Sequence, residues 1–490
     1  MGDRMLFNSW QFLLFFPIVT AAYFVLPHKF RWMLLLLASC LFYMTFMPVY
    51  ILILLFTIIV DYFAGICIEK SEGRRRKVFL TASIIANIGA LAFFKYFNFI
   101  NGNMAELARL IHWNYSIGAL DIILPIGLSF HTFQAMSYTI EVYRGKQKAE
   151  KHFGIYSLYV MFYPQLVAGP IERPQNLIHQ FMEEHKFEYS NVTEGLKLMA
   201  WGLFKKVAIA DRLAIDVNRV YAQPLLYPGL PSILATIFFA FQIYCDFSGY
   251  SDIAIGAARV MGFKLMQNFN KPYFSGSISE FWKRWHISLS TWFRDYLYIP
   301  LGGSRVAKWR WQFNIFIVFL LSGLWHGANW TYVVWGALNG IYLIFSGLTE
   351  NVRKRLVAFI GLDSHPGAHK LLRVAITFSL ICVAWVFFRA KNIQTASFML
   401  GHFADVFKGF PGIHWFKETA QITARFGMRS SFFSIIFIVG VEFALLRYAR
   451  QIHAILQSST PLRWAVYYSL GFSILLFGMF SNSQFIYFQF

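Results

Sequence analysis

His326 lies in the segment SGLWHGANW (residues 322–330), between an apolar run that ends at Leu321 and another that begins at Tyr332. The ordinary pKa of an imidazole is about 6.5 and burial lowers it, so such a histidine would be neutral and able to accept a proton. It could take the proton from a hydroxyl group as that oxygen attacks an acyl carbonyl. The alternative is a structural histidine bonded to a neighbouring carbonyl, and spacing alone does not decide between the two.

The glycines of this region predict a helix that packs closely against a neighbour. Two pairs occur at a spacing of four residues, Gly323 with Gly327 and Gly336 with Gly340. Such pairs let two helix backbones approach one another inside a membrane. If residues 322–330 form one helix, a polar stripe on a single face carries Ser322, His326, Asn329 and Trp330.

Large aromatic side chains recur with helical period over residues 279–296, and cationic side chains lie on the opposite face. We expect one continuous amphipathic helix, capped by Ser279, which would suit the membrane interface. A surface anchor explains the tryptophans but does not require His286. The helix could equally seat a phosphate-bearing cofactor through Lys283, Arg284 or Arg294.

Two further segments place polar groups beside long apolar runs. In QIYCDFSGYSD (residues 242–252), Asp246 and Asp252 would need partners or water at membrane depth. They could orient a histidine or pair with Arg259, and structural pairing is the expectation for both. His131, in the run PIGLSFHTFQ, is expected to be a hydrogen-bonded packing residue.

The elements that must position these residues are membrane helices. Of the 490 residues, 57% are hydrophobic and 14% charged, and the mean hydropathy is +0.49. A soluble domain carries about 25% charged residues, so the solvent of this chain must be lipid. We expect one all-α polytopic membrane domain over residues 1–490, with roughly ten to twelve crossings. The candidate segments are 9–26, 32–47, 49–68, 78–100, 119–141, 153–168, 195–215, 232–260, 312–327, 330–348, 371–389, 432–448 and 464–480.

The net charge of +20 does not indicate nucleic-acid binding. The basic residues form short runs between apolar segments, which is typical of the positive-inside rule and favours anionic lipid headgroups. These runs are residues 74–77, 144–151, 205–206, 308–310 and 353–355.

Several classes of site have no motif in this sequence. The cysteines Cys40, Cys67, Cys245 and Cys382 are scattered, and no metal-ligand spacing is present. Walker, dinucleotide-binding and Gly-x-Ser-x-Gly motifs are also missing from the sequence. We therefore expect no metal site, and the sequence disfavours an ATP-driven pump and a serine hydrolase.

Taken in order, these segments resemble the membrane-bound O-acyltransferase (MBOAT) family. The resemblance is closest to its bacterial branch of alginate O-acetyltransferase membrane subunits, with the peptidoglycan and teichoic-acid acylation proteins nearby. It covers most of the chain, and the ordered set of motifs is specific where each motif alone is weak. The motifs are FNS (residues 7–9), FKY (94–96), PIGLSF (125–130), AGPI (168–171), CDFSGYSD (245–252), NF-x-KPY (268–273), FW-x-RWHIS (281–288), YIPLGG (298–303), LWHG (324–327) and FIYFQF (485–490).

The resemblance implies a ring of tilted transmembrane helices with re-entrant or interfacial helices and a thinned centre. The invariant histidine of the family corresponds to His326, and a second motif position corresponds to His286, so both are implied to be catalytic. The motif-rich core would span about residues 90–345. The side chains expected to contact substrate are Ser322, Trp325, Asn329, Lys283, Arg284, Arg294, Asp246 and Asp252.

The resemblance also implies an activity and partners. Acetyl groups would pass from a cytosolic thioester, acetyl-CoA, across the bacterial inner membrane for O-acetylation of a cell-surface polysaccharide such as alginate. The protein itself would hold no bound cofactor. A periplasmic partner of the SGNH-hydrolase type, a polysaccharide synthesis and export complex and membrane lipids would be the partners.

Three other functions stay open on the sequence. Interrupted helices with buried polar groups also mark transporters of small solutes, although we find no second copy of the His326 or Asp252 segments. A structural scaffold for polymer export would not need so many costly polar groups at membrane depth. A family member that acylates peptidoglycan, teichoic acid or lipid is the alternative within the same class.

Overall fold

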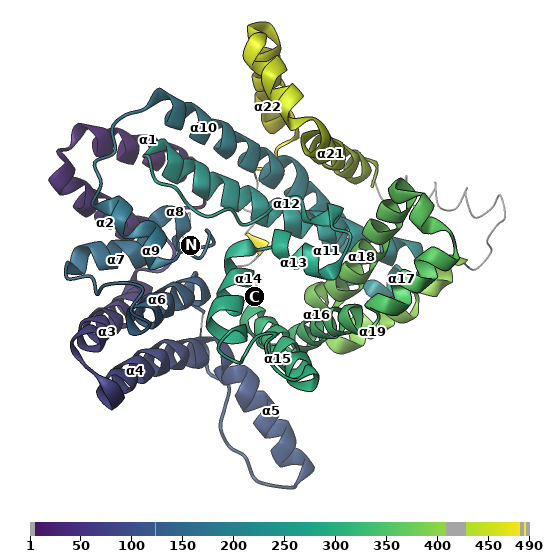
Figure 1. The fold of residues 1–490 in the computed structure, drawn as a ribbon, viewed down its shortest axis with the longest axis horizontal. Coiled ribbons are helices and arrows are strands. Elements are labelled where there is room, and N and C mark those ends of the chain that lie inside the picture. Colours follow the sequence, from purple (N-terminus) through teal and green to yellow (C-terminus); the bar gives the residue numbers. More distant parts are fainter. Residues whose placement is uncertain (1–4, 123, 408–427, 481–484, 487–490) are drawn as a thin grey trace. The chain divides into compact units, whose positions relative to one another are not determined.

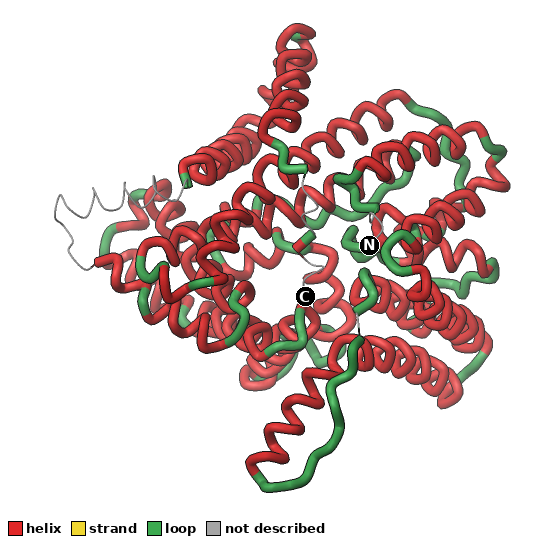
Figure 2. Tube along the Cα trace, turned by 180° about the vertical axis from the view of Figure 1, so that it is seen from behind, coloured by secondary structure: helices red, strands yellow, loops and turns green. Residues whose placement is uncertain are grey.

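The computed structural model describes residues 5–122, 124–407, 428–480 and 485–486, and their regular secondary structure is helical (Figure 1). Figure 2 shows the described helices joined by loops, of which the connection from Leu110 to Leu128 is a long one. The chain divides into two compact units, residues 1–199 with 250–267 and residues 200–249 with 268–490. The all-α architecture expected from the sequence is confirmed, whereas the single domain over residues 1–490 stays a prediction.

The first unit contains the N-terminal helices. They are α1 (Trp10–Val25), α2 (His28–Met44), α3 (Ile51–Lys70), α4 (Gly73–Leu91), α5 (Phe97–Leu110), α6 (Leu128–Tyr143), α7 (Phe153–Met161), α8 (Tyr163–Leu166), α9 (Pro174–Leu177) and most of α10 (Tyr189–Leu203). A π-helical turn, η2 (Ala92–Tyr96), joins α4 to α5.

The second unit contains the remaining helices and both histidines of interest, His286 and His326. These helices are α11 (Asp211–Ala222), α13 (Ile278–Arg284), α14 (Ile287–Phe293), α15 (Lys308–His326), α16 (Trp330–Leu348), α17 (Glu350–Phe359), α18 (Pro366–Arg389), α19 (Ile393–Gly401), α21 (Arg429–Ser458) and α22 (Thr460–Phe477). The π-helical turns η4 (Phe204–Ala210) and η7 (Arg294–Tyr298) also lie here. Helix α12 (Leu230–Val260) contributes residues to both units.

Within the described residues, six helices are long and apolar enough to cross a membrane, so this is a multi-pass membrane protein. They are Pro48–Lys70, Gly73–Leu110, Leu230–Val260, Trp330–Leu348, Pro366–Arg389 and Ser430–Ser458. Two of the expected segments form shorter elements: residues 119–141 are helical only from Leu128, and residues 153–168 form α7 and α8. Phe162, with a non-helical ψ of 111°, separates these two helices, and Pro164 in the first turn of α8 lacks the N–H that would continue α7.

The environments of the six helices differ. In α12, 83% of the most apolar stretch is buried, against 11% in the Ser430–Ser458 helix. Protein therefore surrounds α12, and this explains why the polar segment at residues 242–252 can occur within it.

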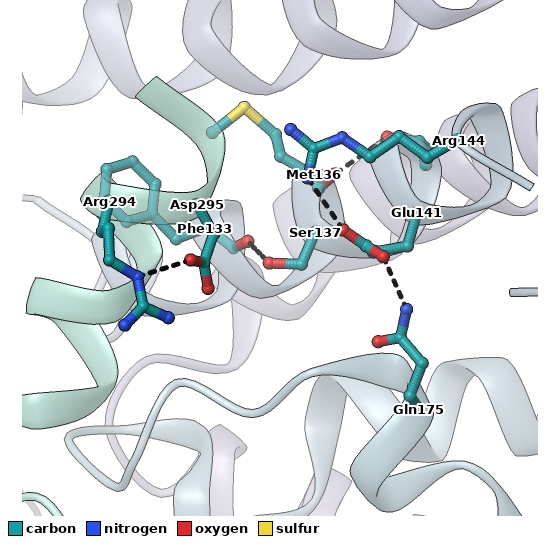
Figure 3. A network of polar contacts seen from close by, with 9 residues as sticks. Phe133, Met136, Ser137, Glu141, Arg144, Gln175, Arg294 and Asp295 are labelled. Carbon is teal, nitrogen blue, oxygen red and sulfur yellow. Dashed lines mark hydrogen bonds and ion pairs between the residues drawn. The ribbon is translucent and has the colours of Figure 1, made fainter. Parts of the chain in front are cut away.

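Polar side chains hold the spans of the first unit together. Asp61 on α3 is fully buried, and its carboxylate accepts hydrogen bonds from Ser83 Oγ at 2.6 Å and Asn87 Nδ2 at 2.8 Å, both on α4. Toward the end of α6, Glu141 accepts from Arg144 at 3.1 Å and from Gln175 on α9 at 2.7 Å (Figure 3). Such bonds satisfy carboxylates that burial would otherwise make costly.

Two of the motifs have structural roles in the first unit. Ser9 is the N-cap of α1, and its hydroxyl accepts the N–H of Phe12 at 3.3 Å. Phe7 stacks on Tyr250 with ring centroids 4.4 Å apart. His131 is buried, and its Nε2 lies 3.4 Å from the hydroxyl of Thr57, as expected for a packing residue.

Candidate active site

A tight helical hairpin positions His326. Helix α15 ends at His326, Gly327 is extended with φ −164°, and α16 begins at Trp330. Asn329 is the N-cap of α16, because its Oδ1 accepts the N–H of Thr331 at 3.0 Å. The single helix considered for residues 322–330 is therefore wrong: Ser322 and His326 lie on α15, but Asn329 belongs to the next helix.

The glycines permit the close approach of α15 and α16 that their spacing predicts. A Cβ atom on Gly323 would lie 2.2 Å from the carbonyl oxygen of Tyr332, and one on Gly336 would lie 2.4 Å from that of Phe319. A Cβ atom on Gly327 would lie 2.1 Å from the ring of Tyr332. Any larger residue would push the hairpin apart and move His326.

A break in the amphipathic segment positions His286. Helix α13 ends at Arg284, α14 begins at Ile287, and His286 between them has a left-handed backbone with φ +42°. The continuous helix predicted for residues 279–296 is therefore wrong, and Ser277 is the cap of α13 in place of Ser279.

Backbone hydrogen bonds from residues 268–270, a segment distant in the sequence, explain the break between α13 and α14. The N–H of Asn270 donates to the carbonyl of Arg284 at 2.9 Å, and the N–H of Ile287 donates to the carbonyl of Asn268 at 2.9 Å. The Oδ1 of Asn268 also accepts from Ser288 Oγ at 2.6 Å. These bonds replace helical bonds on both sides of His286, which no local pattern could reveal.

The two histidine rings lie together in the second unit. Their centroids are 6.4 Å apart, and the exposed fractions of His286 and His326 are 1% and 4%. Burial lowers the pKa of His286 to about 3, so its imidazole is neutral at physiological pH.

Aromatic side chains enclose the pair. The ring of Trp325 lies 4.9 Å from His326 and 6.1 Å from His286. Trp335 and Phe388 lie 4.9 and 5.3 Å from His326, and Phe247 lies 4.6 Å from His286. Trp335 and Phe388 had no place among the predicted site residues, because helices α16 and α18 bring them in.

The cationic candidates lie at different depths. Lys283 is exposed, and Arg284 pairs with Glu280 at 2.6 Å. Arg294 is exposed and pairs with Asp295 at 2.7 Å (Figure 3). Each has an amine or guanidinium able to contact an anionic group.

Asp246 and Asp252 have different environments. Asp246 is buried in the second unit and forms an ion pair with Lys206 at 2.8 Å, so its cation is not Arg259. Asp252 is half-buried in the first unit. The sequence predicts that Lys206 belongs to a short basic run between apolar segments, and this is wrong, because the residue lies within the turn η4 and is only 4% exposed. Its position inside the candidate span 195–215 was the available signal.

Comparison with known proteins decides the family. The chain is 38% identical over 395 residues to the probable alginate O-acetylase AlgI of Pseudomonas aeruginosa, covering 80% of this chain and 73% of the relative. The model of the membrane-bound O-acyltransferase family matches residues 152–390. The chain belongs to the MBOAT family. This confirms the resemblance, and the protein is an O-acyltransferase.

Other relatives of this MBOAT chain carry related names. The peptidoglycan O-acetyltransferase of Helicobacter pylori is 34% identical over 460 residues, covering 86% of this chain and 84% of the relative. The teichoic acid D-alanyltransferase of Bacillus subtilis is 28% identical over 283 residues, covering 55% of this chain and 70% of the relative.

The geometry of this MBOAT site suits acid–base chemistry. A neutral imidazole can accept a proton from a hydroxyl and pass it on, and two imidazoles in one enclosure can act on the same reacting group. The surrounding aromatic rings would keep water away and strengthen every polar interaction inside.

Proposed function

We propose that this protein transfers acetyl groups from cytosolic acetyl-CoA across the bacterial inner membrane for O-acetylation of a cell-surface polysaccharide. The observation that carries the proposal is the pair of buried histidine rings, 6.4 Å apart, in a chain of an O-acyltransferase family. The relative named a probable alginate O-acetylase, at 38% identity, supports alginate as the acceptor. A cell-wall acceptor is the second candidate, favoured by the relative named peptidoglycan O-acetyltransferase.

In the proposed reaction His326 is the general base. It takes the proton from the hydroxyl group of the acyl acceptor as that oxygen forms a bond to the acyl carbon. The carbon–sulfur bond of the thioester then breaks, and His326 returns the proton to the departing thiolate. His286 is the second polar group, placed to hydrogen-bond to the acyl carbonyl. Acid–base assistance of this kind contributes about 10²- to 10⁴-fold to a rate.

The proposed partners follow the same scheme. A periplasmic protein of the SGNH-hydrolase type would receive the acetyl group for delivery to the polymer, within a synthesis and export complex. The exposed cations Lys283 and Arg294 are the proposed contacts for the phosphates of the donor, because guanidinium and ammonium groups bind phosphate.

The test is acetyl transfer by the purified protein in liposomes, with radiolabelled acetyl-CoA, the candidate partner and either alginate or peptidoglycan fragments. We expect His326→Ala to lose about 10²-fold or more of the wild-type rate. His453→Ala is the matched control, because His453 is exposed on α21. A His326→Ala rate equal to wild type would contradict the role of His326, and transfer to peptidoglycan alone would replace alginate as the acceptor.

A further inference from the structure

Two adjacent lysines lie in the interior of the second unit. Lys205 and Lys206 belong to the π-helical turn η4, and each is only 4% exposed. A buried ammonium group is costly unless it is paired and hydrogen-bonded. π-Helical turns also recur at functional sites, because they point side chains where a regular helix would not.

Lys206 sits between two buried carboxylates. Its Nζ lies 2.8 Å from Asp211 Oδ1 and 2.8 Å from Asp246 Oδ1, and these aspartates are 6% and 3% exposed. The second oxygen of Asp246 accepts the backbone N–H of Ile486 at 2.7 Å. Lys205 donates to Ser248 at 2.8 Å. One cation thus joins the start of α11, the middle of α12 and the segment at residue 486.

The backbones around this cluster are in direct contact. A Cβ atom on Gly249 would lie 2.6 Å from the carbonyl oxygen of Gly202 and 3.2 Å from the backbone nitrogen of Lys206. Helix α12 therefore packs backbone to backbone against the lysine-bearing turn, with no room for a side chain at residue 249.

The residue after Asp246 reaches the candidate site. Phe247 packs edge-on against His286, with ring centroids 4.6 Å apart and an interplanar angle of 79°. It also contacts Phe269 at 5.0 Å and Phe485 at 5.6 Å. Edge-to-face contacts of this kind orient one ring against another, so a shift of Phe247 would change the orientation of the His286 imidazole.

We propose that Lys206 is a positioning residue for His286: it fixes Asp246, and through the adjacent Phe247 ring it holds the imidazole in the orientation that acyl transfer requires. This inference rests on the proposed function, in which His286 contacts the reacting group. Lys206 itself does not contact substrate in this account.

The test separates positioning from a purely structural ion pair. Lys206→Met alone leaves two buried carboxylates and can fail to fold, so it is compared with Lys206→Met/Asp211→Asn/Asp246→Asn, which leaves no unpaired charge. Lys206→Arg is the conservative variant. Phe247→Leu removes the ring and leaves every charge in place. All are assayed for kcat and for the KM of acetyl-CoA at equal amounts of folded protein.

We expect the neutral triple variant and Phe247→Leu each to lose about tenfold to 100-fold in kcat with KM within about twofold, because small displacements of a catalytic group have this effect. Lys206→Arg should recover most of the rate. The inference is overturned if Phe247→Leu keeps the wild-type kcat, or if the loss in the variants appears only in KM.

A second readout does not depend on the reaction. The ¹⁵N resonances of His286, assigned with a His286→Asn variant, should shift in the neutral triple variant, which keeps the Phe247 ring, and should not shift in Leu196→Ala, whose side chain is exposed in the first unit. Unchanged resonances in the neutral triple variant would overturn the positioning role of Lys206. If wild type transfers no acetyl group, the proposed function fails, and the ¹⁵N shift still decides the inference.

Discussion

At the scale of the residue, the backbone of His286 carries a cost that its surroundings offset. Its φ of +42° lies in the left-handed region, which residues other than glycine adopt uncommonly, with asparagine, aspartate and histidine found there more often than the rest. Two backbone hydrogen bonds hold it there, one donated by the N–H of Asn270 to Arg284 and one donated by the N–H of Ile287 to Asn268. Non-glycine residues kept in this conformation cluster at functional sites, which agrees with a role for the His286 side chain.

The strain predicts an order of stability among variants. His286→Asn should unfold at a temperature close to wild type, because asparagine tolerates a left-handed backbone. His286→Ala should be less stable than His286→Asn by roughly 1–2 kcal/mol. Thermal unfolding in detergent measures the difference, and equal midpoints for the two variants would show that the backbone is relaxed in solution.

Glu172 gives the protein a predictable pH dependence. Burial raises the pKa of its carboxyl from 4.5 to about 7, although the N–H of Met266 opposes the shift. Between these values the folded protein keeps a proton that the unfolded chain has released. Its stabilising contribution is therefore complete below pH 4.5 and is lost as pH rises toward 7.

The corresponding measurement is the unfolding midpoint as a function of pH. Glu172→Gln should flatten the decline of stability between about pH 4.5 and 7, whereas Glu184→Gln, at an exposed position, should leave it unchanged. If the unfolding midpoints of wild type and Glu172→Gln change with pH in the same way across this window, the assignment to Glu172 is contradicted.

At the scale of the element, the α15–α16 hairpin is the part of the site that the sequence reveals best. The pairs Gly323 with Gly327 and Gly336 with Gly340 predict a close approach of two helices, and the structure has one. The break at His286 could not be predicted, because residues 268–270 supply the bonds from a distance in the sequence. The buried role of Lys206 was also missed, since its partners Asp211 and Asp246 lie on other elements.

The hairpin can be tested with one methyl group. Gly323→Ala should destabilise the protein by about 1–3 kcal/mol and reduce acetyl transfer, because the new Cβ would lie 2.2 Å from the carbonyl oxygen of Tyr332. Gly440→Ala on α21 is the matched control, since nothing lies within 4 Å of its Cβ position. Equal stability of the two variants would mean that the hairpin can open without cost.

At the scale of the whole molecule, composition and motif order predict the membrane class and the family, and both are confirmed. The number of crossings was harder to predict, because apolar runs also build buried protein interior. Helix α6 is an example: most of its residues are buried, yet it is only 16 residues long. Hydropathy alone does not distinguish a helix that faces lipid from one that is buried inside the protein.

If acetyl groups cross the membrane through the His326 and His286 site, transfer depends on which side of the membrane holds the donor and which holds the acceptor. Wild-type protein would be placed in sealed liposomes in one known orientation, with radiolabelled acetyl-CoA at the cytosolic face and the periplasmic partner and polysaccharide only at the other face. We expect label on the polysaccharide across the membrane with wild type and with His453→Ala, and about 10²-fold less with His326→Ala. Label that forms only when donor and acceptor share one face would contradict it.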